Sequence, residues 1–391
     1  MTGPSPRIAL AALLALAAAG AAWARTETVI HHLTVEVPRP PVLSNLDPVP
    51  ADLGLAGARV GLADNLTTGR FLQQGWTLEE SSVPAGGDVA GAARAALAGA
   101  RVLVLHAPAE AVVAIADLPE AQGAILLNTA AGDGSLRGAD CRANVLHALP
   151  STAMRTDALA QFLASRRWDE LVMIRGARPA DLDYAEALRG SLAKFGLGVK
   201  AEKEWAFDAD MRRNASAEVP LFTQEFGDYD ALLIADETGD FGRYVLYNTW
   251  EPRPVAGSEG LTAVTWDEVV ENWGAAQLQS RFEAAAGRPM RPEDYAAWAA
   301  VRAVGEAVTR TGSDDAAALR DYMLSDAFEL AGFKGRPLTF RDWDGQLRQP
   351  IPIVHPRALV EQAPIEGFLH RRTELDTLGT DEPETDCEAF E

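Results

Sequence analysis

Short apolar segments alternate with helical segments along most of this 391-residue chain. Runs of four or five apolar residues are typical of buried strands, and the amphipathic stretches between them are typical of helices. Strand–helix alternation at this spacing predicts parallel βαβ units whose sheets are covered on both faces. The predicted strands are 59–63, 102–105, 124–127, 171–174 and 231–235, and the predicted helices are 67–78, 88–97 (capped by Asp88), 109–116, 157–165, 185–195 (closed by Gly196) and 219–226.

The alternation stops near 149–151 and then restarts, which divides the chain into two α/β blocks at about 58–150 and 151–262. The chain is too long for one ordinary hydrophobic core, so we expect two domains. The elements expected beyond these blocks are a helix opened by Pro292 and ended by Gly312, a helix capped by Ser313 that runs to Met323, and a hairpin turn at Asp344-Gly345 between 338–340 and 351–354.

The N-terminus has the three parts of a cleavable export signal. Arg7 supplies a positive charge, residues 8–20 form an apolar run, and Ala22-Trp23-Ala24 supplies the small residues that signal peptidase reads. We therefore predict a signal peptide over 1–24, a mature chain from Arg25 and a periplasmic location, without membrane insertion after cleavage. The alternative is an N-terminal membrane anchor, but the run is shorter than the roughly 20 residues that span a bilayer.

The two ends of the mature chain are interpreted as extensions. Residues 25–57 are predicted to be a Pro-rich N-terminal arm that contains one strand, and 371–391 an acidic C-terminal tail. Adjacent residues of a strand point to opposite faces, so His31-His32 is not expected to hold a metal ion. An even cysteine count in an oxidising compartment favours a disulfide over two free thiols, so Cys141 and Cys387 are expected to tie the tail to the body.

Composition narrows the range of partners. Apolar residues make up 48% of the chain and charged residues 23%, as in globular proteins. The formal net charge of −21 argues against nucleic acid and anionic membranes as partners. The same charge disfavours an anionic ligand, unless arginine or histidine side chains gather locally.

Enzyme motifs are missing from the sequence. It has no GxSxG, Walker A, HExxH or CxxC motif. The GxGxxG-like string 196–201 follows a predicted helix and enters a strand, which is the reverse of a dinucleotide-binding turn. We therefore expect a protein that is not an enzyme, requires no cofactor and has no metal site.

Several segments, in this order, resemble type I periplasmic solute-binding proteins of the leucine/isoleucine/valine group. They are 149–151 leading into 157–159, then 168–172, and then 333–345 with its Gly…Phe…Gly pattern. The resemblance implies two doubly wound, Rossmann-like α/β lobes joined by a hinge, acting as a monomer. It also implies that lobe 1 comprises 58–150 plus about 267–325, and lobe 2 comprises 151–266 plus about 326–370.

Segments 141–147, 249–258 and 339–350 resemble one branch of these proteins, found alongside alcohol dehydrogenases that depend on pyrroloquinoline quinone (PQQ). This resemblance implies PQQ as the ligand, with an ABC permease or a PQQ-dependent dehydrogenase as partner. The alternatives are an amino-acid or small-acid component of an ABC importer, an accessory protein that holds PQQ without transport, and a periplasmic enzyme.

Candidate ligand-binding residues follow the predicted strands, because ligands of open α/β sheets sit outside the carboxyl ends of the strands. A planar tricarboxylate such as PQQ would need guanidinium groups and a flat ring, which the arginines and Trp266 could supply. The structural alternatives are helix capping for the acids, solvated loops for Arg175 and Arg178, and core packing for Trp266. The candidates are Asp64, Asn65, His106, Asn128, Thr129, Arg175, Arg178, Asp236, Glu237, Arg253, Ser258 and Trp266.

Overall fold

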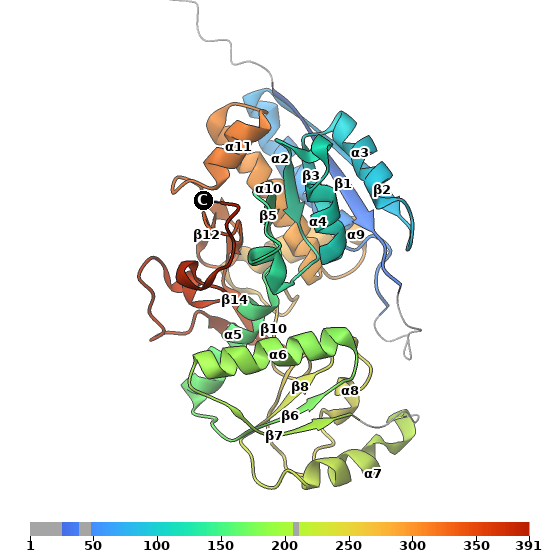
Figure 1. Ribbon diagram of the computed structural model, residues 1–391, viewed down its shortest axis with the longest axis vertical. Helices are drawn as coiled ribbons and strands as arrows, with labels where there is room; N and C mark the ends of the chain where they lie inside the picture. Colours follow the sequence, from blue (N-terminus) through green and yellow to red (C-terminus); the bar gives the residue numbers. More distant parts are fainter. Residues whose placement is uncertain (1–25, 39–47, 206–210, 391) are drawn as a thin grey trace, which may run out of the picture.

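Two lobes, each built on a parallel sheet, are stacked along the long axis of the molecule (Figure 1). The computed structural model describes residues 26–38, 48–205 and 211–390, without the side chains of 211–213. The signal peptide predicted over 1–24 lies outside these residues. The predicted fold class, α/β with two doubly wound lobes, is confirmed.

Lobe 1 contains a five-stranded parallel sheet in the order β2-β1-β3-β4-β5. Successive residues of a strand face opposite sides of a sheet. Val102 and Val104 therefore join one buried cluster, and Leu103 and Leu105 join the other. Its strands are β1 (Thr26–Val35), β2 (Gln74–Val83), β3 (Val102–His106), β4 (Ile125–Asn128) and β5 (Val145–His147).

Helices bury both faces of the lobe 1 sheet. On one face lie α2 (Leu55–Leu72), α9 (Ala275–Ala286), α10 (Pro292–Thr311) and α11 (Ala316–Met323). On the other face lie α3 (Val89–Gly99) and α4 (Ala109–Ala116), with the Asp88 side chain accepting a hydrogen bond from the amide of Gly91 as the predicted cap.

Lobe 2 repeats this plan with a four-stranded parallel sheet in the order β7-β6-β8-β9. Its strands are β6 (Leu171–Arg175), β7 (Val199–Glu204), β8 (Ala231–Ala235) and β9 (Val255–Gly257). One face is covered by α5 (Thr152–Arg166) and α6 (Pro179–Lys194), and the other by α7 (Met211–Gln224) and α8 (Gly242–Val245).

Two small antiparallel sheets lie where the chain passes between the lobes. Their strands are β10 (Thr262–Ala263), β14 (Ile351–His355) and β15 (Ala358–Ala363) in one sheet, and β11 (Leu330–Ala331), β12 (Pro337–Phe340) and β13 (Leu347–Arg348) in the other. The predicted Asp344-Gly345 turn therefore joins β12 to β13, and not to 351–354, which pairs with β10 and β15.

The predicted N-terminal arm is wrong, because residues 26–35 form β1 inside the lobe 1 sheet. This strand pairs with β2 on one side and β3 on the other. Ile30 and Leu33 are fully buried, on opposite faces of the sheet. The apolar alternation correctly predicted a strand, but it carries no information about where that strand inserts.

The strand predicted over 59–63 is also wrong, because these residues lie within α2. Helix α10 packs directly on this part of α2, and glycines allow the close approach. A Cβ at Gly57 would lie 1.8 Å from the carbonyl oxygen of Asp294, and one at Gly61 would lie 3.0 Å from that of Trp298. The helix predicted over 67–78 accordingly ends at Leu72 and is followed by β2.

The C-terminal segment packs on the body of the protein. Cys141 and Cys387 form the predicted disulfide. Residues 374–377 and 382–384 form the short 3₁₀ helices η4 and η5. The cap of α11 is Asp315, and not Ser313 as predicted. None of the helices within the described ranges is long and apolar enough to cross a bilayer.

Replacing Leu33 with alanine tests the placement of β1. Removing a fully buried leucine from a central strand should lower the free energy of unfolding by about 2–5 kcal/mol. Val37, which is 42% exposed just beyond the strand, is the matched control, and Val37→Ala should change stability by no more than about 0.5 kcal/mol. Urea denaturation measures both, and equal small effects would indicate a detached arm instead.

Candidate functional site

A cavity of about 720 Å³ lies at the carboxyl ends of the lobe 1 strands. The end of each of the strands β1, β2 and β3 contributes to it, together with the first turns of α2 and α10. This is the edge of an open α/β sheet where ligands bind, because loops there present polar groups. The polar residues that line it are Thr34, Glu36, Glu80, Ser81, Ser82, His106 and Glu293.

Hydrogen bonds orient several of these side chains. The hydroxyl of Ser82 donates to Oε1 of Glu36 over 3.1 Å. The Ser81 hydroxyl lies 2.7 Å from Nε2 of His31, which is buried behind it. Glu80 is neutralised by a two-pronged ion pair with Arg59, and this hydrogen bonding lowers the pKa of Glu80. Glu36 is exposed and remains a negative group at the cavity rim.

Glu293 occupies the first turn of α10 and lines the cavity. Removal from water raises the pKa of Glu293, and the neighbouring charge of Asp294 adds to the rise. The positive charges of Arg155 and Arg291 act in the opposite direction. A partly desolvated carboxylate in a cavity has a strong preference for a cationic or hydrogen-bond-donating partner.

Lobe 2 presents Arg155 from the first turn of α5. Its guanidinium makes paired contacts of 2.9 and 3.1 Å with the two carboxylate oxygens of Glu237. It also donates to the carbonyl of Ala263 in β10 over 3.1 Å, and it lies 5.4 Å from the centroid of the Tyr184 ring. Arg155 also interacts electrostatically with Glu293, which lines the lobe 1 cavity.

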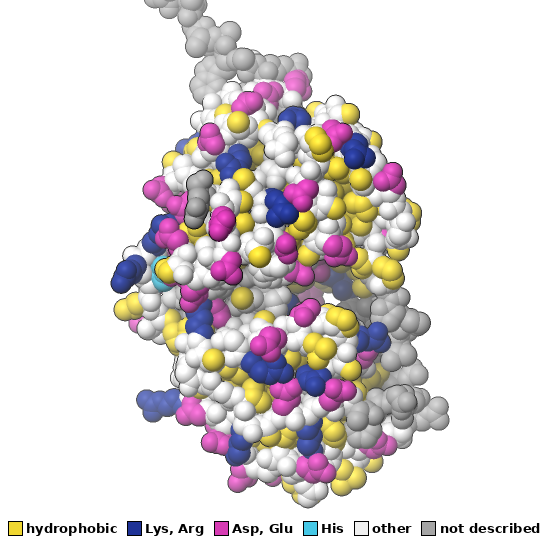
Figure 2. All heavy atoms as spheres, in the orientation of Figure 1, with side chains coloured by type: hydrophobic (Ala, Val, Ile, Leu, Met, Phe, Trp, Pro, Cys, Tyr) yellow, Lys and Arg dark blue, Asp and Glu magenta, His cyan; other side chains and the backbone are white. Residues whose placement is uncertain are grey.

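The surface is hollowed between the two lobes on the face shown in Figure 2. The lobe 1 cavity presents carboxylates and hydroxyls, and Arg155 of lobe 2, which interacts electrostatically with its Glu293, is paired with Glu237. Such a set can bind a small polar solute, with hydrogen bonds from both sides.

Of the twelve predicted residues, His106 lines the cavity, and Glu237 pairs with Arg155 of α5. Asn128 and Thr129 follow β4 as predicted, but both are fully buried. The Asn128 side chain accepts from the amides of Ala130 and Ala131, and the Thr129 hydroxyl donates to the carbonyl of Leu105. The Asn128 bonds close the turn after β4 and the Thr129 bond joins it to β3, so both side chains are engaged within the protein.

Asp64 and Asn65 are predicted as ligand-binding residues because they follow the predicted strand 59–63, but this strand is wrong. Both lie in the middle of α2, where they hold neighbouring helices. Asp64 accepts from the indole of Trp298 and pairs with Arg281. Asn65 is buried and donates to the carbonyl of Val301 over 2.9 Å.

The two arginines proposed after β6 are engaged by carboxylates. Arg175 pairs with Glu202 at 2.8 Å and with Glu204 at 2.9 Å, both on the neighbouring strand β7. Arg178 pairs with Asp240 at 2.5 Å. A free anion would therefore have to displace carboxylates to reach either guanidinium.

The remaining predicted residues have structural contacts or lie elsewhere. Asp236 accepts hydrogen bonds from the amides of residues 240–242, and the Ser258 hydroxyl accepts from the amide of Asp236. Trp266 is buried and stacked on Tyr295, with ring centroids 4.8 Å apart. Arg253 lines a separate cavity of about 510 Å³ on lobe 2 with Trp168 and Tyr247.

The cavity residues Thr34, Glu36, Ser81 and Glu293, and Arg155 that interacts with Glu293, were not predicted. Thr34 and Ser81 lie near the ends of β1 and β2, and Glu36 follows β1, whose place in the sheet was not predicted. Arg155 was missed because the helix was predicted to begin at 157, although Ser151 is its N-cap and carries the signal for an earlier start.

The histidines give no metal site. His31 and His32 point apart, and burial lowers the pKa of His32 to about 3, which keeps its ring neutral. Within the part of the chain that the structure describes, no three His, Cys, Asp or Glu side chains are grouped as metal ligands.

Neither a known protein-family profile nor a curated protein matches the sequence. Solved structures do match the fold. A leucine-, isoleucine-, valine-, threonine- and alanine-binding protein from Brucella ovis, in a closed conformation, gives a TM-score of 0.66 at 14% identity, over 84% of this chain and 90% of that chain. A branched-chain amino acid ABC transporter periplasmic ligand-binding protein from Burkholderia xenovorans gives 0.69 at 15% identity, over 93% and 100%.

A solute-binding protein of an ABC transporter from R. palustris, in complex with benzoate, gives a TM-score of 0.61 at 14% identity, over 93% of this chain and 99% of that chain. Identities this low establish the fold and leave the ligand open. The chain therefore has the fold of type I periplasmic binding proteins.

The pH dependence of a Glu293→Gln variant tests whether this carboxylate is desolvated. Because the folded-state pKa of Glu293 is raised above its ordinary value of 4.5, its contribution to stability is present at low pH and is lost as pH rises through the folded pKa. Glutamine stays neutral, so the variant should gain stability relative to the wild type as pH rises above the ordinary glutamate pKa of 4.5. Urea denaturation at several pH values measures this difference.

The control is Asp321→Asn, which removes a carboxylate that is 79% exposed on α11. It should show no such gain. A Glu293→Gln difference that is flat with pH, or of opposite sign, would contradict the assignment of a desolvated carboxylate.

Proposed function

We propose that this protein is a periplasmic solute-binding protein that captures a small molecule between its lobes. The observation that carries the proposal is the 720 Å³ cavity at the carboxyl ends of the lobe 1 strands, whose Glu293 interacts electrostatically with Arg155 of lobe 2. Binding there would favour a closed arrangement of the lobes, because the solute gains contacts from both. In this proposal the protein binds and releases its solute without transforming it.

The charge at the cleft favours a solute that carries an amino or other cationic group. Glu36 and Glu293 offer carboxylates, and Thr34 and Ser81 offer hydroxyls. Arg155 could bind a carboxylate of the same solute if its guanidinium is shared with Glu237. Amino acids and related amines therefore fit the described groups, in agreement with the amino-acid alternative from the sequence.

PQQ is the less favoured ligand. Its three carboxylates need free guanidinium groups, but Arg175 and Arg178 are paired with carboxylates and Arg253 lies in a different cavity. Trp266 is stacked within the core and offers no free face. Delivery of PQQ to a dehydrogenase, with or without transport, remains a proposal that rests on sequence resemblance alone.

We propose that the solute is delivered to an ABC permease, in keeping with the fold. Export by the predicted signal peptide is part of the same proposal, and the Cys141–Cys387 disulfide supports an oxidising compartment.

A thermal-shift and calorimetric panel tests the proposal. The compounds are L-leucine, L-arginine, putrescine, benzoate, citrate and PQQ. A specific ligand at 100 times its Kd should stabilise the folded protein by about 2.7 kcal/mol, seen as a saturable rise in Tm. We expect this with an amine-bearing compound and not with citrate. A response to PQQ alone would favour the cofactor hypothesis, and no response to any compound would count against small-solute capture of these classes.

Glu293→Gln should weaken binding of the amine-bearing compound about 10- to 100-fold, because a hydrogen bond to a charged group contributes about 1.5–3 kcal/mol. Isothermal titration calorimetry measures Kd, and Asp321→Asn on lobe 1 should leave it unchanged. Equal affinity for the wild type and Glu293→Gln would place the site elsewhere.

A further inference from the structure

The C-terminal residues 374–387, here called the strap, contact both lobes. They follow β15, contain η4 and η5, and end at the disulfide. Three groups of contacts fix the strap, and they alternate between lobe 1, lobe 2 and lobe 1 again.

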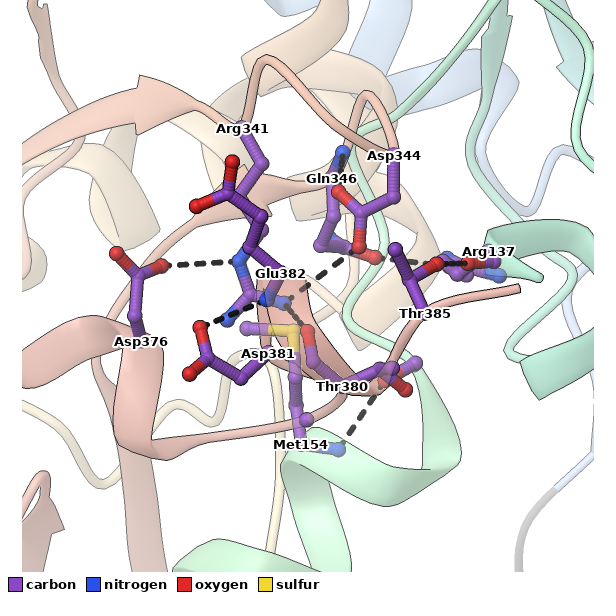
Figure 3. Close-up of polar contacts among 12 residues, drawn as sticks. Arg137, Met154, Arg341, Asp344, Gln346, Asp376, Thr380, Asp381, Glu382 and Thr385 are labelled. Carbon is purple, nitrogen blue, oxygen red and sulfur yellow. Dashed lines mark hydrogen bonds and ion pairs between the residues drawn. The ribbon is translucent and has the colours of Figure 1, made fainter. Parts of the chain in front are cut away.

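The first group holds the strap to the β12–β13 hairpin. Asp376 is 1% exposed, and its Oδ1 accepts from Nε of Arg341 over 3.0 Å and from Nε of Arg348 over 2.8 Å. Figure 3 shows Arg341 reaching Asp376 on one side and the carbonyl of Thr380 on the other. The hairpin bonds to the end of β5 and its apolar residues join the lobe 1 core, so this anchor belongs to lobe 1, although 326–370 was predicted to belong to lobe 2.

The second group holds the strap to lobe 2, within three residues of the first. The amide of Gly379 donates to Oδ2 of Asp157 in α5 over 2.8 Å, and its carbonyl accepts from Nζ of Lys194 in α6 over 2.8 Å. Gln161 of α5 donates to the hydroxyl of Thr377 over 2.8 Å. Leu378 lies between these bonds and is fully buried in the lobe 2 core.

The third group returns to lobe 1 and is covalent. The hydroxyl of Thr385 donates to the carbonyl of Arg137 over 2.9 Å, as Figure 3 shows. Two residues later, Cys387 is bonded to Cys141. Arg137 is itself buried and donates to Gln346 of the hairpin loop, so the first and third anchors belong to one body.

We propose that the strap is a latch that restrains the rotation of lobe 2 against lobe 1, and that the disulfide keeps the latch engaged. Hinge rotation changes the positions of α5 and α6 relative to lobe 1, so it must break or strain the contacts at 377–379. The strap cannot diffuse away while both of its ends are tethered, so these contacts re-form at high effective concentration. Reduction of the disulfide releases one end and loosens the restraint. The proposal depends on the two-lobed architecture and not on which solute is bound.

Distance distributions between the lobes test the latch. They are measured without ligand by pulsed electron–electron double resonance. Spin labels are attached through genetically encoded non-cysteine residues at Asp321 of α11 and Glu186 of α6, whose side chains are each 79% exposed. The wild type should give one narrow distribution. Cys387→Ser, and the wild type treated with a phosphine reductant, should give a distribution at least about 1.5 times as wide, or a second population, because the released end lowers the effective concentration.

A pair of lysine variants separates the latch from a general loss of stability. Lys194→Met removes the contacts with Gly379 and Asp157, whereas Lys200→Met removes an exposed ion pair with Glu170 that lies wholly within lobe 2. Lys194→Met should broaden the distribution and Lys200→Met should not. Broadening in Cys387→Ser or Lys194→Met, but not in Lys200→Met, supports the latch. Wild-type distributions in both Cys387→Ser and Lys194→Met overturn the latch, whatever the outcome of the ligand panel.

Discussion

Helices bury both faces of each parallel sheet, and this burial restricts where a ligand-binding site can lie. Val102 and Leu103, adjacent in β3, belong to two different buried clusters. Val172 and Met173 do the same in lobe 2. With the faces closed, only the edges of the sheets can present polar groups to a solute. The carboxyl edge of the lobe 1 sheet carries the cavity, and Arg155 in the first turn of α5 is the lobe 2 charge that interacts with its Glu293.

The lobes are connected by further contacts in addition to the chain segments that pass from one lobe to the other. The β12–β13 hairpin extends the lobe 1 side, and the C-terminal residues then pass from the hairpin to lobe 2 and back. Buried ion pairs such as Asp376 with Arg341 and Arg348 often add little net stability, but they fix geometry because breaking one leaves a buried charge unpaired. The C-terminal segment therefore contributes to how the lobes are held, as well as to the folding of each.

Local patterns in the sequence predicted much of the framework. The buried strands at 102–105, 171–174 and 231–235 and the helix opened by Pro292 were predicted because their signals are strong and local. The position of β1 could not be predicted, because the order of strands in a sheet is set by long-range packing. Residues 59–63 were assigned to a strand, whereas tertiary contact with α10 across Gly57 and Gly61 makes them helical. The disulfide was predictable because only two cysteines exist.

The same limits of local sequence patterns explain why much of the candidate site was not predicted. Sequence cannot tell which residues after strands close turns, as Asn128 does, and which line the cavity, as His106 does. The arginines chosen as anion ligands are paired with acids that are distant in sequence, such as Glu202 for Arg175. Glu293 was not predicted, because the packing of α10 against α2 brings it to the cavity.

Hydrogen–deuterium exchange with and without a saturating amine-bearing compound, chosen as the one in the ligand panel that raises Tm most, tests the central claim most directly. The cleft account predicts slower exchange in peptides that cover 34–37, 80–83 and 106–108 of lobe 1 together with 152–156 and 236–238 of lobe 2. Protection confined to one lobe, or centred on 246–261 around the second cavity, would contradict binding between the lobes.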